Sequence, residues 1–341
     1  MKVSVVILNW NGRKMLEKYL PSVVQFTTIP DVEIVVADNG STDDSLHYLS
    51  EQFPSVRQVK LPQNYGFADG YNRALSQIDA QYFVLLNSDV SVSDGWLDPL
   101  CKYMDEHLDV VACQPKIRSA VRPNYFEHAG AAGGYIDAYA YPFCRGRIFS
   151  EVEKDEGQYD TIEDIFWASG ACLMVRANEY FSAGGLDGTF FAHMEEIDLC
   201  WRLRSRGKRI VCHPGSVIYH YGGGTLNVDS PRKTYLNFRN NLLMIYKNQT
   251  EEKLYSTLFV RFFMDALAAI MFLIKFDFAN FRAVLKAVVE FYKIRKNYTQ
   301  QRAENLSKTI NKTIKEYKDF SIVWSFYVRR KKRYNQLYRL N

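Results

Sequence analysis

The sequence predicts an α/β protein built on a parallel, doubly wound sheet. Three short apolar runs, at residues 3–8, 33–37 and 82–86, are rich in β-branched or aromatic residues, and each is followed at once by Asn, Asp, Gly or Ser. Such runs are typical of buried strands. Segments with helical periodicity lie between them, and strands that alternate with helices favour parallel pairing with right-handed crossovers.

The connecting elements can be taken in chain order. Residues 13–24 form the first predicted helix, because its apolar residues recur at helical spacing: Met15, Leu16, Tyr19, Leu20 and Val23. Two more helix-like stretches, 44–52 and 70–77, lie between the second and third strands. Residues 115–165 are rich in Gly, Tyr and Pro, and we expect this less regular stretch to lie over one edge of the sheet.

The pattern becomes regular again after residue 165. The segment FWASGACLMVRA predicts a strand, residues 195–206 predict a helix that ends at Gly207, and residues 209–212 predict a last strand. The six cysteines are ten or more residues apart and include no C-x-x-C pair, so we expect reduced cysteines in the core rather than a zinc or dithiol site.

Polar residues stand at the ends of the first three predicted strands. These tips read NWNG from Asn9, DNGSTD from Asp38 and NSD from Asn87. Ligands of open α/β sheets bind at the carboxyl ends of the strands, and short Asn and Asp side chains can hold a base and ribose there. Turn formation alone would explain any one tip, since these residue types are common in turns. Three tips on one sheet favour a nucleotide site.

The absent motifs narrow the ligand class. No G-x-G-x-x-G follows the first strand, and the sequence has no P-loop, so a nicotinamide dehydrogenase and a P-loop nucleotidase are both disfavoured. A phosphate-bearing ligand would then need another source of positive charge. Asp89 is the natural holder of a divalent cation, because hard oxygen ligands suit Mg²⁺ or Mn²⁺.

Charge divides the chain into two unlike parts. Residues 251–341 carry 19 Lys and Arg against 8 Asp and Glu, a net charge of +11, whereas residues 1–250 carry a net charge of −6. A basic part favours a polyanionic partner, either nucleic acid or an anionic membrane surface. Residues 282–296 predict a basic amphipathic helix, and the tail YVRRKKRYNQLYR has the composition of a segment that lies on anionic lipid.

An apolar stretch at residues 254–276 also bears on membrane contact. Arg261 and Asp265 interrupt it and leave a charge-free run of nine residues, whereas a membrane span needs about 20. A simple transmembrane helix is therefore disfavoured, and the two charges, four residues apart, are expected to pair on one helical face. The apolar run before Asn9 is too short for a signal peptide, so the catalytic part is expected in the cytoplasm.

Seven elements together resemble the family 2 glycosyltransferases. They are VVILNWNG, VVADNGSTD, NYGFADGYNRAL, YFVLLNSDV, a Ser-Gly-Ala stretch, FFAHMEEIDLCWRLRSRGKRI and VIYHYGGGT, in this order. The chain is most similar to the bacterial branch that includes rhamnosyltransferases and galactofuranosyltransferases. The resemblance covers residues 1–248 and implies a GT-A fold with a mixed central sheet, followed by a helical, membrane-associating appendage at residues 249–341.

The resemblance also implies a donor site. Asp38, helped by Asn9, would bind the base and ribose of a sugar nucleotide, and the rest of the pocket would be lined by Asn64, Gly66, Gly70, Asn72 and Asn87. Asp89 would coordinate the Mg²⁺ or Mn²⁺ that bridges the diphosphate, and His220 matches a late histidine that reaches the metal or the diphosphate. The family's metal motif is commonly Asp-x-Asp, and here its first position is Asn87, so one carboxylate is missing.

A general base is expected in the segment that begins at Glu195. An inverting transfer needs a carboxylate to take the proton of the acceptor hydroxyl, and Glu195, Glu196 and Asp198 are candidates at a helix start, where carboxylates also simply stabilise the helix. The family motif points to Glu196 but leaves Glu195 open. Asp198 is expected to orient the site or to pair with Arg202. An acceptor site is implied at Trp167, Ser169 and Gly170, where Trp167 would stack on a sugar or belong to the core.

The expected function is that of an inverting glycosyltransferase at the cytoplasmic face of the cell membrane, attached peripherally. Its donor would be a deoxythymidine diphosphate-rhamnose or a UDP-hexose, and its acceptor a glycan on a polyprenyl diphosphate carrier in surface polysaccharide synthesis. A sugar-nucleotide-binding protein without catalysis is the first alternative, because Asn87 and Glu196 depart from the family motifs. A nucleic-acid-binding protein is the second, although no base-reading motif accompanies the basic part.

Overall fold

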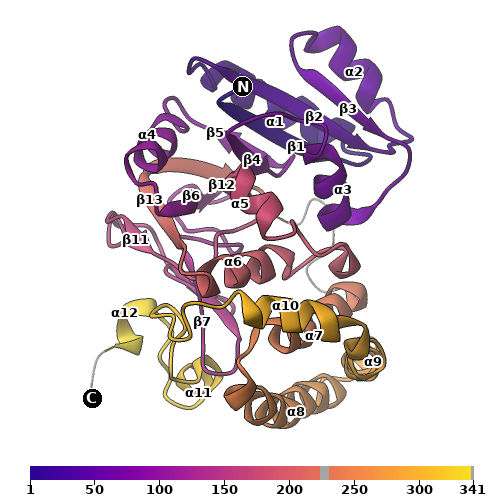
Figure 1. The fold of residues 1–341 in the computed structure, drawn as a ribbon, viewed down its shortest axis with the longest axis vertical. Coiled ribbons are helices and arrows are strands. Elements are labelled where there is room, and N and C mark those ends of the chain that lie inside the picture. Colours follow the sequence, from indigo (N-terminus) through magenta and orange to yellow (C-terminus); the bar gives the residue numbers. More distant parts are fainter. Residues whose placement is uncertain (223–229, 339–341) are drawn as a thin grey trace.

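The computed structural model describes residues 1–222 and 230–338 and centres on a nine-stranded sheet (Figure 1). The strand order is β11, β13, β6, β12, β4, β1, β2, β3, and β5 pairs with β13. The bounds of these strands are β1 Val3–Asn9, β2 Val32–Asn39, β3 Arg57–Leu61, β4 Tyr82–Leu86, β5 Val90–Val92, β6 Val110–Ser119, β11 Glu163–Asp164, β12 Cys172–Arg176 and β13 Arg209–His220.

One half of the sheet is parallel, as the sequence predicts. β1 lies between β2 and β4, and the helices α1 (Arg13–Phe26), α2 (Ser45–Gln52) and α3 (Gly66–Leu75) make the crossovers. The strand β3, parallel to β2, was not expected. Only two of its five residues are buried, so its apolar pattern is too weak to see beside the helices that flank it.

The other half is mixed, which corrects the expectation of a wholly parallel sheet: β12 opposes β4, whereas β6 and β13 run in the same direction as β4. β12 runs antiparallel to β4, with Cys172 opposite Leu86, and β6 runs antiparallel to β12. The reason is the route of the chain: Cys172 begins its strand at the edge of the sheet where β4 has ended, so no crossover returns the chain to the opposite edge. The sheet is therefore mixed, as the resemblance implies.

The irregular stretch contains a second, smaller sheet. Its strands are β7 Gly134–Ile136, β8 Pro142–Cys144, β9 Arg147–Ile148 and β10 Glu151–Val152, all paired antiparallel. The last large strand, β13, extends well past the predicted residues 209–212 and has a register shift between His213 and Val217. All six cysteines are buried and free, which confirms the prediction of reduced core cysteines.

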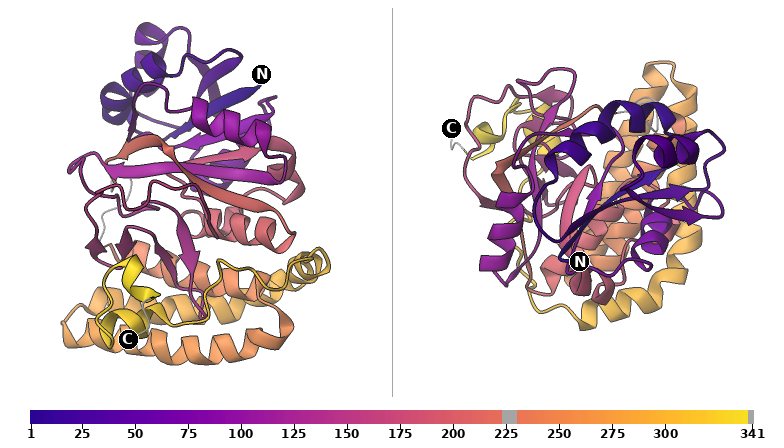
Figure 2. Two further views of the ribbon diagram at one scale, coloured as in Figure 1. Left: turned by 90° about the vertical axis from the view of Figure 1, so that its left-hand side faces the viewer. Right: turned by 90° about the horizontal axis from the view of Figure 1, so that it is seen from above.

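The remaining helices include α4 (Asp98–Glu106), α5 (Ala177–Ser182) and α6 (Glu195–Ser205), and a C-terminal layer that lies at the end of the molecule opposite β3 (Figures 1 and 2). This layer contains α7 Pro231–Asn248, α8 Glu251–Ile274, α9 Phe278–Ile294, α10 Thr299–Ser307, α11 Ile322–Tyr327 and α12 Tyr334–Leu337. The predicted boundary after residue 248 falls between α7 and α8. Because α7 packs along α9 and α10, the division into two domains stays a prediction.

The basic tail does not extend away from the rest of the protein. Tyr334 packs against Tyr135 with ring centroids 5.3 Å apart, and its backbone N–H donates to Glu153 Oε1 at 3.2 Å. Lys332 pairs with Glu151 at 2.7 Å. The described part of the tail therefore contacts the small sheet through Tyr334 and Lys332, and its contact with anionic lipid stays a prediction.

Candidate active site

The strand tips of β1 and β2 meet in a buried hydrogen-bonded pair. Asn9 and Asp38 are partners in the parallel register, and Asn9 Nδ2 donates to Asp38 Oδ1 at 3.1 Å. The other oxygen of Asp38 accepts from the backbone of Ser41 at 3.0 Å. Asn11 Oδ1 in turn accepts from the backbone N–H of Thr42 at 2.7 Å. The two tips thus form one ordered group, as the register of parallel strands requires.

Asn39 connects this group to the next loop, a role that the sequence analysis missed. Its Nδ2 donates to Asn64 Oδ1 at 3.1 Å and to the carbonyl of Gly66 at 3.0 Å. Gly70 lies against it, and a Cβ on Gly70 would come within 2.9 Å of Asn39 Nδ2. Gly66 has a φ of +77°, and a Cβ there would meet the ring of Phe191 at 2.5 Å. Both positions therefore require glycine, because the side chains of Asn39 and Phe191 approach the backbone too closely for a Cβ.

Asn72, predicted to line the same pocket, is engaged elsewhere. Its Nδ2 donates to the carbonyl of Leu186 at 2.7 Å, and its Oδ1 accepts from Tyr180 Oη at 2.6 Å and from the backbone N–H of Leu186 at 3.0 Å. Both ends of the amide are therefore satisfied by protein. The structure gives Asn72 a role in holding α3 to the segment after α5.

The metal corner predicted at Asp89 is assembled at the end of β13. β5, which follows Asp89 directly, pairs antiparallel with β13 so that Val90 lies opposite His220. His220 Nε2 is 3.1 Å from Asp89 Oδ1 and 3.4 Å from Asn87 Nδ2. Glu127 completes the corner with Oε2 3.2 Å from His220 Nδ1. No sequence signal marked Glu127, which lies in the irregular stretch.

Charge pairing dominates the protonation of this corner. Burial opposes a charge on His220, but the hydrogen bonds and charges of Asp89 and Glu127 outweigh it and raise the pKa of His220 to about 10. Burial also opposes ionisation of Glu127, and the imidazolium beside it nevertheless lowers the pKa of that carboxyl. The last three residues of VIYHYGGGT lie outside the described residues.

The side chains at this corner suit a divalent cation whose remaining ligands come from a substrate. They are a carboxylate of Asp89, the amide of Asn87 and the imidazole of His220, all ligand types that such cations accept. Within residues 1–222 and 230–338, no cluster of three His, Cys, Asp or Glu side chains is arranged to hold a metal ion alone. The remaining ligands would have to come from diphosphate oxygens, as is common for cations at nucleotide sites.

The acidic pair at the start of α6, Glu195 and Glu196, makes no ion pair with any residue that the structure describes. Burial and the charge of Glu196 raise the pKa of Glu195 well above its ordinary value, and burial raises the pKa of Glu196. Glu195 is buried and Glu196 is half-buried as a residue, and one oxygen of each carboxyl is enclosed without a hydrogen-bond partner among the described residues. An added Cβ on Gly170 would lie 3.8 Å from Glu196 Oε1, so Gly170 adjoins this carboxylate. Of the two residues, Glu196 is the less buried one.

A strained turn presents this pair. Phe191, His193 and Met194 all have positive φ, from 63° to 73°, a region that non-glycine residues occupy only where the surroundings enforce it. Asn240 of α7 supplies part of that enforcement, because its Nδ2 lies 3.0, 2.9 and 2.8 Å from the carbonyl oxygens of Phe190, Ala192 and His193.

The N-terminus of α3 holds the same turn from the donor side. The backbone N–H groups of Phe67 and Ala68 donate to the carbonyl of Phe191 at 2.7 and 3.3 Å. The turn is therefore fixed between the predicted donor loop and α7. We call residues 190–194 the base turn.

Asp198 is placed in a buried ionic network. Its carboxylate accepts from Arg202 Nη2 at 2.9 Å, Lys247 Nζ at 2.8 Å and Asn248 Nδ2 at 2.8 Å, and Lys247 also pairs with Asp187 at 2.6 Å. Burial disfavours its ionisation, but the charges of Lys247 and Arg202 keep the pKa of Asp198 below its ordinary value. The expected pairing with Arg202 is present, and the network joins α6 to α7.

The residues implied for the acceptor separate in the structure. Trp167 is 3% exposed and donates from Nε1 to the carbonyl of Tyr135 at 3.0 Å, which corrects the idea that it stacks on a sugar. Ser169 is also buried, and its Oγ donates to the carbonyl of Ala129 at 2.6 Å. Gly170 alone adjoins the acidic pair. The ring of Trp167 packs directly against Gly134, since a Cβ at that position would lie 2.1 Å from the ring. This contact helps to enclose Trp167 in the core.

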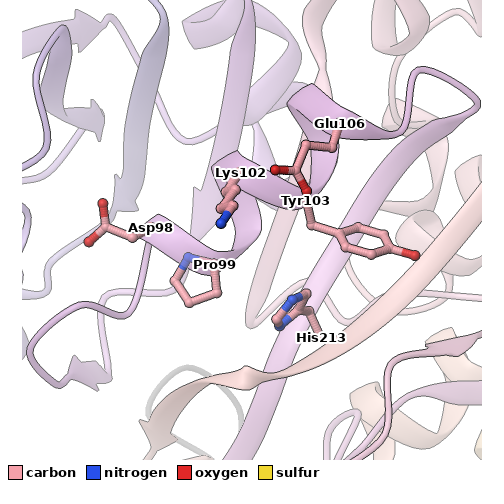
Figure 3. Close-up of a pocket in the computed structure, with 6 residues that line it drawn as sticks. All are labelled: Asp98, Pro99, Lys102, Tyr103, Glu106 and His213. Carbon is pink, nitrogen blue, oxygen red and sulfur yellow. The ribbon is translucent and has the colours of Figure 1, made fainter.

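A separate cavity of 520 Å³ lies on α4 and β13, away from the strand tips (Figure 3). It is lined by Asp98, Pro99, Lys102, Tyr103, Glu106 and His213. None of the predicted site residues contributes to it. The candidate active site is therefore the group formed by the strand tips, the metal corner and the base turn.

Known proteins share the sequence and the fold. The model of glycosyl transferase family 2 matches residues 4–176, more than half of the chain. An N-acetylglucosaminyl-diphospho-decaprenol L-rhamnosyltransferase of Mycobacterium tuberculosis is 28% identical over 231 residues, which are 64% of this chain and 75% of that protein.

Among solved structures, S. aureus TarS in complex with UDP-GlcNAc aligns with a TM-score of 0.58 and 17% identity over 90% of this chain and 89% of that one. GalNAc-T7 with UDP, GalNAc and Mn²⁺ aligns with a TM-score of 0.55 and 16% identity over 72% of this chain and 48% of that one. These likenesses show the GT-A fold. The family match and the rhamnosyltransferase relative show the activity class, and the chain belongs to the family 2 glycosyltransferases.

Proposed function

We propose that the protein is an inverting glycosyltransferase that moves a sugar from a nucleoside diphosphate donor to a hydroxyl of a lipid-linked glycan. The observation that carries the proposal is the base turn, which holds Glu196, the less buried of two adjoining glutamates that make no ion pair with a described residue, between the donor loop and α7. A deoxythymidine diphosphate-rhamnose or a UDP-hexose is the donor class, and a polyprenyl diphosphate carrier is the acceptor class that the decaprenol-linked relative favours.

The donor is bound by the strand tips. Asp38, held by Asn9 and by the backbone of Ser41, offers its carboxylate to the ribose and base, because its orientation is set before the ligand arrives. Asn64 is joined to this group through Asn39, and Gly66 and Gly70 allow Phe191 and Asn39 to pack against the loop, because a Cβ at either glycine would clash with them.

The transfer itself needs one proton acceptor. Glu196 takes the proton of the acceptor hydroxyl while the oxygen bonds to the anomeric carbon and the bond from that carbon to the diphosphate breaks on the opposite face. Burial raises the pKa of Glu196, so this carboxylate is a stronger base than an exposed one. Glu195 is too enclosed to reach a substrate, and its carboxyl lies close enough to Glu196 for the two to interact electrostatically.

The diphosphate leaves at the metal corner. Asp89, Asn87 and His220 are the residues that would hold Mg²⁺ or Mn²⁺, which when bound would neutralise the charge that grows on the leaving diphosphate. Glu127 orients the imidazole of His220 through its second ring nitrogen. This arrangement keeps His220 in place whether its other nitrogen faces Asp89 or a cation.

Peripheral attachment to an anionic membrane is the second part of the proposal. α8 and α9 expose a broad surface that we call the apolar face, formed by Tyr255, Phe259, Phe262, Phe263, Leu267, Ile270, Met271, Ile274, Phe276, Phe278, Leu285, Val289 and Tyr292. A surface of this kind on a soluble protein marks an interaction site. An anionic bilayer is the occupant that matches it, because the C-terminal part carries a net charge of +11.

The helix α8 is long and apolar enough to span a membrane by length and composition, although one such helix is weak evidence. Its polar side argues for lying in the interface. Arg261 and Asp265 pair at 3.2 Å on the packed face, as the sequence predicts, and Tyr141 Oη donates to Asp265 at 2.9 Å. These buried contacts tie α8 along its length to the catalytic part, and only its other side is free for lipid.

A donor screen tests the proposal. The purified chain is incubated with a panel of nucleotide sugars, Mn²⁺ or Mg²⁺ and a short-chain polyprenyl diphosphate glycan, and products are identified by mass spectrometry. One donor class should be consumed with inversion at the anomeric carbon, and Glu196→Gln and Asp89→Ala should each lose most turnover. Donor binding without product from any acceptor would instead support the non-catalytic alternative. The missing carboxylate at Asn87 is the reason for considering that alternative.

A further inference from the structure

A second large cavity lies beside the apolar face and has no place in the proposed chemistry. It is a groove of 800 Å³ between the first turns of α8, the end of α6 and the connection from α10 to α11. Four lysines line it, Lys253, Lys312, Lys315 and Lys318, and Asp319 is the one acidic residue among the described lining residues. We call this cavity the lysine groove.

The four lysines make no ion pair in the described parts of the chain. None of them lies within 4.0 Å of a carboxylate there, although ion pairs occur throughout the rest of the molecule. Burial, with the charge of Lys315, lowers the pKa of Lys318 against the opposing charges of Glu316, Glu163 and Asp319. Ammonium groups gathered in this way repel one another, and a bound anion would remove that cost.

The rest of the lining suits the oxygens of a phosphate ester. Thr313 and Asn311 line the groove with a hydroxyl and an amide, and Ser256 lines it with a hydroxyl that donates to the carbonyl of Lys253. Hydroxyl and amide groups donate to phosphate oxygens, and lysine ammonium groups serve as point charges for them. The lining as a whole therefore combines charge with short donors.

The position of the groove on α8 identifies the source of the phosphate. Ser256 and Val260 line the groove, and on the adjacent helical stripe Phe259 and Phe263 are 66% and 53% exposed. The apolar face and the lysine groove therefore share one helix, which lies at the end of the molecule farthest from β3 (Figures 1 and 2). A ligand with a phosphate and a hydrocarbon chain would reach both at once.

We propose that the lysine groove binds the phosphate of an anionic lipid whose chains contact the apolar face. The inference rests on the proposed membrane attachment and adds to it a defined head-group site. Attachment would then depend on lipid type, and the orientation of the catalytic part above the bilayer would be set by one bound head group.

The test compares groove variants with a matched pair elsewhere. Lys312→Ala with Lys315→Ala removes two groove charges, and Lys14→Ala with Lys60→Ala removes two exposed charges from the catalytic part. Binding is measured by calorimetry with short-chain phosphatidylglycerol below its micelle concentration, and by sedimentation with vesicles of phosphatidylcholine with or without phosphatidylglycerol. The groove pair should weaken binding about 10- to 30-fold, since each of its two lysines is expected to contribute as much as one lysine at an anionic membrane surface. The control pair should weaken binding little.

A third variant separates a site from general attraction. Ser256→Trp fills the groove from an exposed position without changing charge, and it should abolish saturable binding of the short-chain lipid. Equal losses in the two lysine pairs, wild-type binding by Ser256→Trp, or equally tight binding of inorganic phosphate would each overturn the proposal. No sugar donor takes part in these measurements, so their failure leaves the proposed transfer reaction standing. Circular dichroism and the thermal unfolding midpoint report that each variant is folded.

Discussion

Two neighbouring glutamates at the start of α6 differ in what surrounds them. Glu195 is enclosed, and Glu196 is partly exposed beside Gly170. The family motif left the base open between them, and their burial favours Glu196. Neither carboxyl has a cationic partner of the kind that Asp198 has in Lys247 and Arg202. As a consequence, the charge of Glu196 helps to raise the pKa of Glu195.

The pH profile of turnover should distinguish their roles. Because burial raises the pKa of Glu196, activity should be lost on acidification above the ordinary glutamate pKa of about 4.3. Burial and the charge of Glu196 keep Glu195 protonated, so Glu195→Gln replaces a neutral group and should leave the acid limb of kcat/KM in place with turnover retained. Glu196→Gln should lose about 100-fold or more of kcat. Lost turnover in Glu195→Gln, with activity intact in Glu196→Gln, would reverse the assignment.

The missing carboxylate at the metal corner can be restored. Asn87→Asp places a second carboxylate beside His220 and Asp89, and hard cations bind more tightly as anionic oxygen ligands are added. The Mn²⁺ concentration for half-maximal donor turnover should fall about 10-fold. Asn178→Asp adds the same charge at an exposed position and should leave that concentration unchanged. The same Mn²⁺ requirement in Asn87→Asp would place the cation elsewhere.

At the scale of elements, α7 connects the base turn to the helices below it. Asn240 holds three carbonyl oxygens of the turn. The next residue, Asn241, donates to the carbonyl of Ala140 at 2.9 Å and accepts from Arg261 of α8. Two consecutive asparagines thus fix α7 between the proposed base and the helix that carries the apolar face.

Removing the Asn240 amide should affect catalysis more than binding. Asn240→Ala removes the side-chain donor of the Ala192 and His193 carbonyls in a strained turn, so Glu196 should lose its position and kcat should fall about 100-fold with donor KM little changed. The comparison is Asn305→Ala, a buried asparagine that bonds Asn248 and does not contact the base turn. Both should lower the free energy of unfolding by about 1–3 kcal/mol. Parallel losses of kcat in the two variants would show that stability alone is responsible.

At the scale of the whole molecule, the apolar face and the active site belong to opposite sides of the C-terminal layer. α7 faces the base turn, and α8 and α9 turn their exposed residues outward. Val284 and Phe291 of α9 pack inward, whereas Leu285 is exposed and belongs to the apolar face. One side of these helices therefore packs against the rest of the protein, and the other side is exposed and can contact lipid.

Polar substitutions on the apolar face should release the protein from membranes. Phe259→Ser with Phe263→Ser removes two exposed rings, each of which would contribute about 1.5–3 kcal/mol if buried in lipid, so vesicle affinity should fall at least about 10-fold. Leu108→Ser with Val121→Ser alters residues that are 79% and 66% exposed on the catalytic part and is the control. Detergent activity should persist in both. Equal vesicle binding by the two pairs would exclude lipid contact at this face.

Local pattern was sufficient for the features that depend on neighbours in the chain. The strand tips at Asn9, Asp38 and Asn87, the acidic start of α6 and the pairing of Arg261 with Asp265 could all be predicted, because strand and helix periods place such residues without knowledge of the rest of the fold. The family resemblance added the GT-A fold and the mixed sheet.

Contacts between distant segments were decided only by packing. Glu127 reaches His220, Asn240 reaches the base turn, and Trp167 is enclosed by Gly134, although nothing in the adjacent sequence marks these partners. The basic tail likewise docks on the small sheet because Tyr334 finds an aromatic surface there. Composition gives the kinds of groups that such segments carry, and the burial of each group in the folded chain selects which of them meet.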